Sequence, residues 1–430
     1  MRKILSFLIV AATIYFVACN VEEEPISQTR ELPTKNPYAI SIPQAIERLN
    51  AIFPDATKTT RTTIADVATI TRGDLGLTTR AVNGALPTDP LIYIIPTDNN
   101  GCAIVGADER MEAVYAVLDN STLTAEDILG VETRSDSQNE EDGEEIKEFV
   151  STMLNDAITY NLLSLESSGD VVNFYHYTYN PIDKLGPLLK TKWEQGLPYS
   201  IAYPIQFGGK TGCAPLAAAQ ILYFLRHPNR LISTTYNWET ISLFEYFPYI
   251  DVNEYPLVQK RMVSQLIYDI AVIMEAAPVQ VGSNSSTIKV GVDIDKQINV
   301  FKRTRFESAC EDITYDSLIV KSMLMDSLPV FTYSHPSSED YSGHAWVIDG
   351  YSNMVKTTRC MAIPSFIRKD TIEYVHCNYG GRGVCDGYYQ HGIFDLRIER
   401  DSVLYELEKG DSIRNIDANF SQNVRIIKLQ

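Results

Sequence analysis

The sequence predicts an α+β protein with a small N-terminal α+β domain and a larger C-terminal domain that has a helical half and an antiparallel β-sheet half. In the first third, a helical apolar pattern is followed by hairpin-like apolar runs. Further on, an Ala-rich stretch follows Cys213, and two Gly-flanked apolar runs carry His344 and Asn378. The length of 430 residues also favours more than one domain.

The N-terminus has the features of an export signal. Arg2 and Lys3 precede an apolar run over residues 4–17. This run is too short to span a bilayer, which needs about 20 residues, but is typical of a secretory signal peptide. It ends in Phe16-Val17-Ala18-Cys19, which resembles a bacterial lipobox, although Phe16 replaces the usual Leu.

We therefore expect residues 1–18 to be a lipoprotein signal peptide and Cys19 to carry the lipid. Residues 19–35 would be a polar tether to the outer membrane. The residues that follow the cysteine, 20–24, resemble the acidic tag that sends lipoproteins of the Bacteroidetes type to the cell surface. A signal peptide cut elsewhere is the alternative.

Composition excludes some classes of partner. The net charge of −18 and the pI of about 4.8 argue against nucleic acid, because phosphate binding needs clustered Lys and Arg. The seven cysteines are sparse for a disulfide scaffold and show no zinc spacing, so no metal or cofactor is expected. The disulfide pattern of the cysteines other than Cys19 stays open.

Residues 36–165 are expected to form the N-terminal domain with its acidic linker. Helical spacing runs from 40 to 53, two apolar runs at 91–95 and 102–105 flank a turn-like segment, and 113–118 can add a third strand. An acidic run at 139–145 is typical of a solvated linker or helix face, and helical spacing resumes from 146 to 163. Periodicity is then lost, so we expect a connector over 166–184 and the larger domain over 185–430.

Cys213 lies where a reactive thiol could be activated. Gly212 precedes it, and Pro215 and an Ala-rich run follow, which predicts a helix that begins at Cys213 and ends near Arg226. The positive end of the helix dipole favours the thiolate, which is the nucleophilic form. The alternative is a small apolar cysteine that only packs at a helix start.

A cysteine nucleophile needs a base and a group that orients the base. His344 begins a run that predicts a buried strand, and His376 and Asn378 share one face of a second strand that enters a Gly-rich turn. Residues 352–370 between these strands are rich in polar side chains and are expected to form a loop. His376 is the rival base and is otherwise a core residue. Asp349 adjoins a glycine and is interpreted as a structural turn residue.

These segments resemble the streptopain family of papain-like cysteine peptidases. The order Cys, His, Asn is that of papain-like enzymes, and the Cys-to-His separation falls within their usual roughly 130–150 residues. The matching blocks, in the family's order, are 193–199, 211–213, 219–221, 236–238, 343–345, 349–351, 378–380 and 386–389.

The resemblance implies a papain-like fold and an enzyme that hydrolyses protein or peptide substrates through a thioester intermediate. It also implies that the enzyme prefers an apolar side chain two residues before the cut. It implies Cys213 as nucleophile, His344 as general base and acid, Asn378 as the group that orients the imidazole, and Gln195 in the oxyanion hole. Substrate-wall residues implied by the resemblance are Gly282, Ser283 and Ser285.

The chain departs from the family at two aromatic positions. Tyr379 and Gly381 stand where the family has Trp, so the resemblance does not imply the family's Trp shielding of the His–Asn pair here. Residues 91–95 and 101–110 resemble the family's Spi-type inhibitory propeptide, which implies a precursor inhibited by its own N-terminal domain.

Two alternatives stay open. Another Cys/His acyl-transfer enzyme, such as a transglutaminase or amidase, usually places an Asp close after the His. A surface binding protein on a retired peptidase scaffold is the non-enzymatic alternative. The intact set of Cys213, His344, Asn378 and Gln195 argues against it.

Overall fold

The structure is a computed structural model, and it describes residues 36–54, 56–57, 64–76, 86–130, 141–167, 175–245, 256–280, 288–334, 343–360, 366–394 and 424–430. The described residues belong to one compact unit, Lys35–Gln430. Within them, no helix is both long and apolar enough to cross a membrane.

The N-terminal part has the predicted helix and hairpin. Helix α1 (Ile42–Ile52) begins where Ser41 caps it, with the Gln44 side chain bound back to the Ser41 backbone N–H at 2.8 Å. The strands of this part are β1 (Ala68–Thr71), β2 (Pro90–Thr97), β3 (Gly101–Gly106) and β4 (Val114–Leu118). The helices that follow are α2 (Ala125–Ile128) and α3 (Glu141–Ser167). Helix α3 therefore begins inside the acidic run and not after it.

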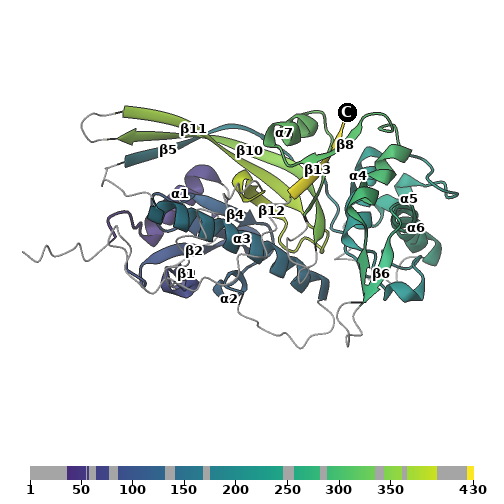
Figure 1. Cartoon of the computed structure of the whole chain (residues 1–430), viewed down its shortest axis with the longest axis horizontal. Coiled ribbons are helices and arrows are strands. Elements are labelled where there is room, and N and C mark those ends of the chain that lie inside the picture. Colours follow the sequence, from purple (N-terminus) through teal and green to yellow (C-terminus); the bar gives the residue numbers. More distant parts are fainter. Residues whose placement is uncertain are drawn as a thin grey trace, which may run out of the picture. The chain divides into compact units, whose positions relative to one another are not determined.

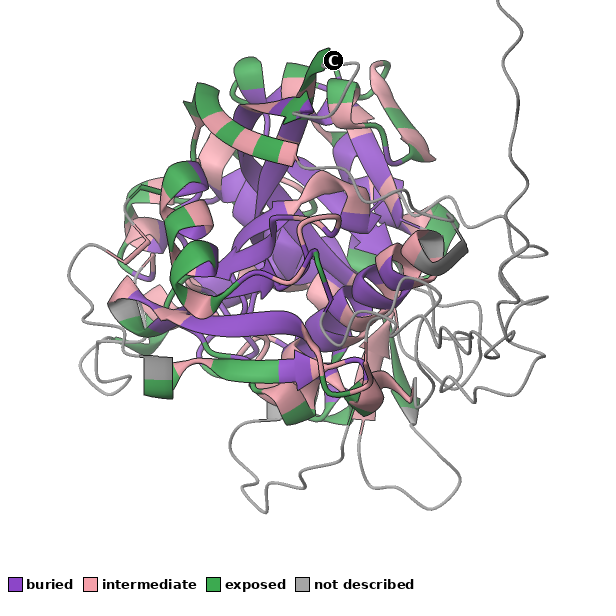
Figure 2. Ribbon diagram, turned by 90° about the vertical axis from the view of Figure 1, so that its left-hand side faces the viewer, coloured by how far each residue is buried: buried purple, intermediate pink, exposed green. Residues whose placement is uncertain are grey.

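Helices cover both faces of these strands because their apolar side chains alternate. Ile92, Ile94 and Ile104 belong to the same core as α3, whereas Tyr93 and Val105 belong to a second core with α1. Side chains along a strand point alternately to its two faces, so each strand contributes to both cores. Figure 2 shows the buried residues gathered on the central strands.

One sheet continues from the N-terminal part into the C-terminal part. Its order is β1-β2-β3-β4-β12-β11-β10-β9-β13-β8, and β5 (Tyr175–Leu185) pairs with β10 beside this path. Here β8 is Cys310–Thr314, β9 is Val330–Ser334, β10 is His344–Cys360, β11 is Phe366–Asn378 and β13 is Val424–Leu429. Strand β12 (Gly387–Gln390) pairs with β4 at the junction, where a Cβ on Gly387 would lie 2.2 Å from the Val117 carbonyl oxygen. Glycine is needed there because the two backbones approach so closely. The predicted domain limits stay a prediction.

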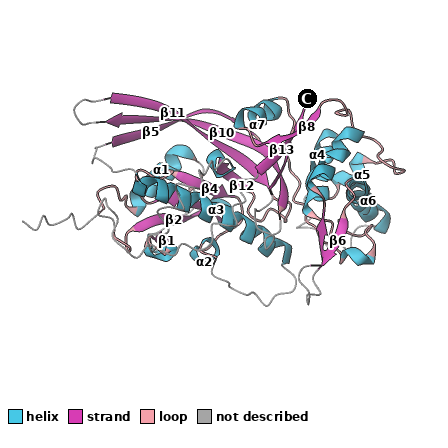
Figure 3. Cartoon of the chain, in the orientation of Figure 1, coloured by secondary structure: helices cyan, strands magenta, loops and turns pink. Residues whose placement is uncertain are grey.

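The C-terminal part has a helical half and a sheet half (Figure 3). The helical half contains α4 (Cys213–Leu225), α5 (Trp238–Ser242) and α6 (Leu257–Ile273), with the small hairpin β6 (Ala277–Gln280) and β7 (Ile288–Gly291). The 3-10 segment η7 (Ile294–Arg303) follows. The sheet half contains β8 (Cys310–Thr314), α7 (Ser317–Met325), β9 (Val330–Ser334), β10 (His344–Cys360), β11 (Phe366–Asn378) and β13 (Val424–Leu429).

A long ribbon corrects two predictions. The segment expected as an irregular connector contains strand β5 (Tyr175–Leu185), which pairs with β10 from Tyr351 to Cys360. Residues 352–370, expected as a loop because they are polar, are mostly strand, since β10 and β11 pair as far as Cys360 and Phe366. Both errors have one cause: the ribbon extends away from the core, so its strands carry polar side chains (Figure 1).

Candidate active site

Cys213 is the first residue of α4, as predicted, and Gly212 precedes it with a positive φ of 82°. Its side chain is partly buried. The backbone N–H of Ala345 donates a hydrogen bond to the thiol, which places the sulfur beside the first residues of β10. The backbone N–H of Thr211 donates to the Gln195 carbonyl oxygen at 3.0 Å, so the predicted oxyanion segment adjoins the loop before Cys213.

His344 is the first residue of β10, immediately before Ala345. Its Nε2 lies 3.1 Å from the carbonyl oxygen of Tyr379. A carbonyl oxygen only accepts hydrogen bonds, so Nε2 carries a proton in this arrangement. The structure therefore places the Cys213 thiol beside Ala345, the residue that follows His344, where α4 meets the sheet.

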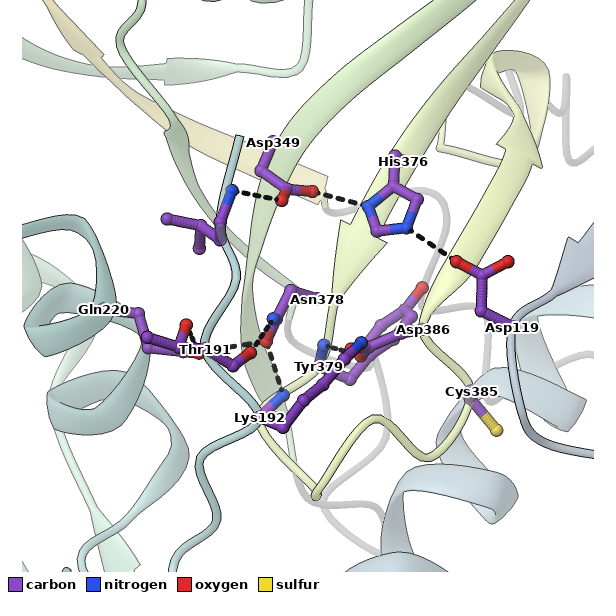
Figure 4. A network of polar contacts seen from close by, with 12 residues as sticks. Asp119, Thr191, Lys192, Gln220, Asp349, His376, Asn378, Tyr379, Cys385 and Asp386 are labelled. Atoms are coloured by element: carbon purple, nitrogen blue, oxygen red, sulfur yellow. Dashed lines mark hydrogen bonds and ion pairs between the residues drawn. The ribbon is translucent and has the colours of Figure 1, made fainter. Parts of the chain in front are cut away.

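Asn378 ends β11 and pairs with Val347, three residues along β10 from His344. Its side-chain amide donates to the Thr191 carbonyl oxygen at 2.9 Å, and its oxygen accepts from Gln220 Nε2 at 3.1 Å. These bonds attach Asn378 to α4 and to the segment before it (Figure 4). Its predicted pairing with the His344 imidazole stays a prediction.

Aromatic rings surround the His344 imidazole. Tyr379 is buried, with its ring centroid 6.0 Å from that of His344 and 5.7 Å from that of Trp346. Phe149 of α3 lies 5.2 Å from the imidazole centroid and 5.5 Å from the Trp346 centroid. Tyr379 thus packs against the imidazole at one position where the streptopain-like pattern has Trp.

Helix α3 also occupies the space beside Gly381, the second position where the streptopain-like pattern has Trp. A Cβ on Gly381 would lie 2.3 Å from Ile146 Cδ1, so any side chain at position 381 would occupy the space that Ile146 now fills. One residue earlier, Glu145 forms an ion pair with Lys289 of β7 at 3.4 Å. Three successive contacts, through Glu145, Ile146 and Phe149, place α3 over the site.

The environment of Cys213 disfavours the thiolate in this structure. Burial raises the pKa of the Cys213 thiol, and the Glu145 carboxylate raises it further. The hydrogen bond from the Ala345 N–H opposes these effects and lowers the pKa. Because the thiolate is the nucleophile, an arrangement that keeps the proton on sulfur is an unreactive one.

His376 is part of a separate buried network (Figure 4). It is 2% exposed, with Nδ1 2.6 Å from Asp349 and Nε2 3.2 Å from Asp119. Burial alone lowers the pKa of His376, but the Asp349 carboxylate and then Asp119 raise it to about 10. His376 is therefore a cation that joins Asp119, just after β4, to Asp349 of β10. Asp349 lies within a strand and not in the turn expected for it.

Other predicted site residues lie outside the described part of the chain, namely Cys19, Gly282, Ser283 and Ser285. The six cysteines within the described part all have free thiols. In those same residues, no group of three or more His, Cys, Asp or Glu side chains is placed to hold a metal ion.

The sequence interpretation missed the contribution of α3. Glu145 belongs to an acidic run, which is usually a solvated helix face, and nothing in its pattern indicates a contact with Lys289. Ile146 and Phe149 have ordinary helical core spacing. The one available signal was Gly381, because a glycine in place of a large aromatic residue leaves a volume that another side chain can fill.

Comparison with known proteins agrees with the predicted family and fold. Residues 193–389 match the model of the peptidase C10 family, which is the streptopain family. The chain is similar to a fragment of prointerpain A from Prevotella intermedia, at 19% identity and a TM-score of 0.50, over 78% of this chain and 94% of that chain. It is also similar to active interpain A cysteine protease from that organism, at 21% identity and a TM-score of 0.39, over 57% of this chain and 94% of that one.

The predicted fold class is confirmed by the likeness to the prointerpain A fragment, with its helical and antiparallel parts. No curated protein sequence matches the chain.

Proposed function

We propose that this chain, whose residues 193–389 match the peptidase C10 family model, is a cysteine endopeptidase made as a latent precursor. The proposal rests on the contact between the N-terminus of α4 and the first residues of β10. The Cys213 thiol lies at a helix N-terminus and accepts a hydrogen bond from Ala345, next to His344. The proposed nucleophile and the proposed base therefore lie on adjoining elements, as acyl transfer by a cysteine requires.

In the proposed reaction the Cys213 thiol transfers its proton to His344, and the sulfur attacks the carbonyl carbon of the scissile peptide. The Cys213 backbone N–H and the Gln195 side-chain amide stabilise the oxyanion. The tetrahedral intermediate collapses, the C–N bond breaks, and His344 protonates the leaving amine. Water, deprotonated by His344, then hydrolyses the thioester and regenerates the thiol.

Asn378 is the proposed orienting group in the mature enzyme. In the precursor its side chain is bound to Thr191 and Gln220, while the His344 imidazole donates to the Tyr379 carbonyl oxygen. Release of α3 removes Phe149 from the imidazole and gives the ring room to turn toward Asn378. From the family's example, we propose that substrates carry an apolar side chain two residues before the cut.

Latency follows from the position of α3. Phe149 packs on the imidazole, and burial together with the Glu145 carboxylate raises the pKa of the Cys213 thiol, so both partners of the reaction are held unreactive. Because α3 belongs to the same chain, its effective concentration over the site is high, and even weak contacts suffice. Strand β5 is paired along β10, so we place the maturation cut before Tyr175 and not inside the strand.

We also propose that the precursor is exported and anchored to the outer membrane through a lipid on Cys19. This proposal rests on the N-terminal sequence alone.

Self-processing of the purified precursor tests the proposal. Wild-type precursor should be nearly inactive on casein, and activity should appear together with a new N-terminus before Tyr175. The Cys213→Ala precursor should stay uncut and inactive while its circular dichroism spectrum is unchanged. Casein hydrolysis by Cys213→Ala at the wild-type rate would refute the proposed nucleophile, and an uncut precursor as active as the processed form would refute latency.

A further inference from the structure

The hairpin of β6 and β7 is held against the loop that ends at Cys213. Val290 of β7 packs on Gly212, and Ile288 packs on Gly208. Side chains alternate along a strand, so Lys289, which lies between these two residues, points to the other face of β7. Lys289 is thereby fixed on a wall beside the nucleophile, on the part of the chain that matches the peptidase family.

The ammonium group of Lys289 is bound to an acid that comes from α3. Its Nζ lies 3.4 Å from Glu145 Oε1, and the same Glu145 carboxylate is close enough to Cys213 to raise the pKa of the thiol. The Glu145 carboxylate is therefore paired with Lys289 in the precursor and lies within electrostatic range of the catalytic sulfur. The next α3 side chains, Ile146 and Phe149, fill the space against Gly381 and His344.

The ion pair itself contributes little to holding α3. The side chains of Lys289 and Glu145 are 30% and 42% exposed, and ion pairs of that exposure contribute little to stability because water screens them. Retention of α3 by the buried Ile146 and Phe149 is the larger effect. Lys289 is therefore better explained as a residue that binds a substrate side chain once α3 has left the site.

We propose that Lys289 is a specificity-determining residue that binds an Asp or Glu side chain of the substrate close to the scissile bond. Glu145 occupies the place of that acidic side chain in the precursor. The inference rests on the proposed peptidase function and adds the class of substrate to it: acidic protein segments that also carry the apolar residue two positions before the cut.

The experiment uses mature enzyme and pairs of fluorogenic peptides that differ only by Glu or Gln at one position. The substituted position is moved in turn from three residues before the cut to three residues after it. Wild-type enzyme should favour Glu at one position by about threefold to fivefold in kcat/KM, the range that partly exposed ion pairs support. The preference should shrink as salt screens the charges.

Variants of Lys289 decide the assignment. Lys289→Met should abolish the Glu preference, Lys289→Glu should convert it into a preference for Lys, and Lys289→Arg should keep it. Lys296→Met is the matched control, because Lys296 is 31% exposed and is paired at 3.1 Å with Glu275, outside α3. That control should behave as wild type.

The outcomes separate this inference from the proposed function. Cleavage of the neutral peptides with no Glu preference at any position, or a preference that survives in Lys289→Met, overturns the role of Lys289 and leaves the peptidase proposal standing. Failure of the mature wild-type enzyme to cleave any of the peptides or casein overturns both.

Discussion

Gly381 leaves room for Ile146 only because it has no side chain. A Cβ at this position would lie 2.3 Å from Ile146 Cδ1, and Ile146 is 1% exposed. Gly381→Ala therefore forces a buried side chain to move in the precursor. In the proposed mature enzyme, which lacks α3, the same substitution would meet no such obstacle.

The magnitude follows from the geometry. Cδ1 is the mobile end of Ile146, so the side chain can turn, but its surroundings are packed. Inserting one methyl group into a packed site typically costs about 1–3 kcal/mol. At about 1.4 kcal/mol the fraction of precursor with α3 displaced rises about tenfold. The uncut Gly381→Ala chain should then be about tenfold more active than the wild-type precursor.

The assay compares initial rates of peptide hydrolysis by precursors that mass spectrometry shows to be uncut. Ile146→Val removes the Cδ1 atom itself and serves as the partner in a double-mutant cycle. Ile146→Val alone should loosen α3 slightly, by about 0.5–1.5 kcal/mol. The double variant should be less active than Gly381→Ala. Equal activity of Gly381→Ala and wild-type precursors, or a double variant more active than both single variants, would refute this account of latency.

Three further outcomes are expected. In the precursor, Glu145→Gln should lower the pKa of the Cys213 thiol, so the pH profile of its alkylation should shift to lower pH; an unchanged profile would deny the electrostatic effect. His344→Ala should lower kcat/KM of the mature enzyme by about 10²–10⁴-fold, and His376→Ala far less; equal losses would move the base to His376. Asp119→Asn should speed release of the cleaved prodomain by about threefold to tenfold at neutral pH in a dissociation assay, because the asparagine keeps an acceptor for His376 but loses the charge–charge attraction at this half-exposed side chain. That difference should vanish as pH rises through about 10, where His376 loses its proton; a difference independent of pH would contradict the role of the charge.

Local sequence pattern predicted the elements that bury apolar faces. The helix at Ile42–Ile52, the β2–β3 hairpin and the helix that starts at Cys213 follow from capping residues, alternation and helical spacing. The prediction that Cys213 and His344 act together came from the family blocks, because no local pattern fixes a contact between residues so far apart in sequence.

The rest depends on long-range packing. Strand β5 was missed although Tyr175, Tyr177 and Tyr179 alternate, because an exposed ribbon lacks the apolar pattern that marks a strand. The continuity of the sheet through β4 and β12 depends on a close backbone approach at Gly387. The contacts of α3 depend on how two parts of the chain dock, which spacing along one helix does not encode.

The most direct test of the proposed nucleophile is to map the site of covalent modification by a peptidyl thiol-directed inhibitor. Mature enzyme is inactivated with the inhibitor, digested, and the modified residue is identified by mass spectrometry. Cys310 is an internal control, because it is the other partly buried free cysteine of the described residues. The account predicts one modification, on Cys213, in proportion to the loss of activity, and much slower modification of the precursor. Modification of Cys310 instead, or full activity after Cys213 is modified, would contradict it.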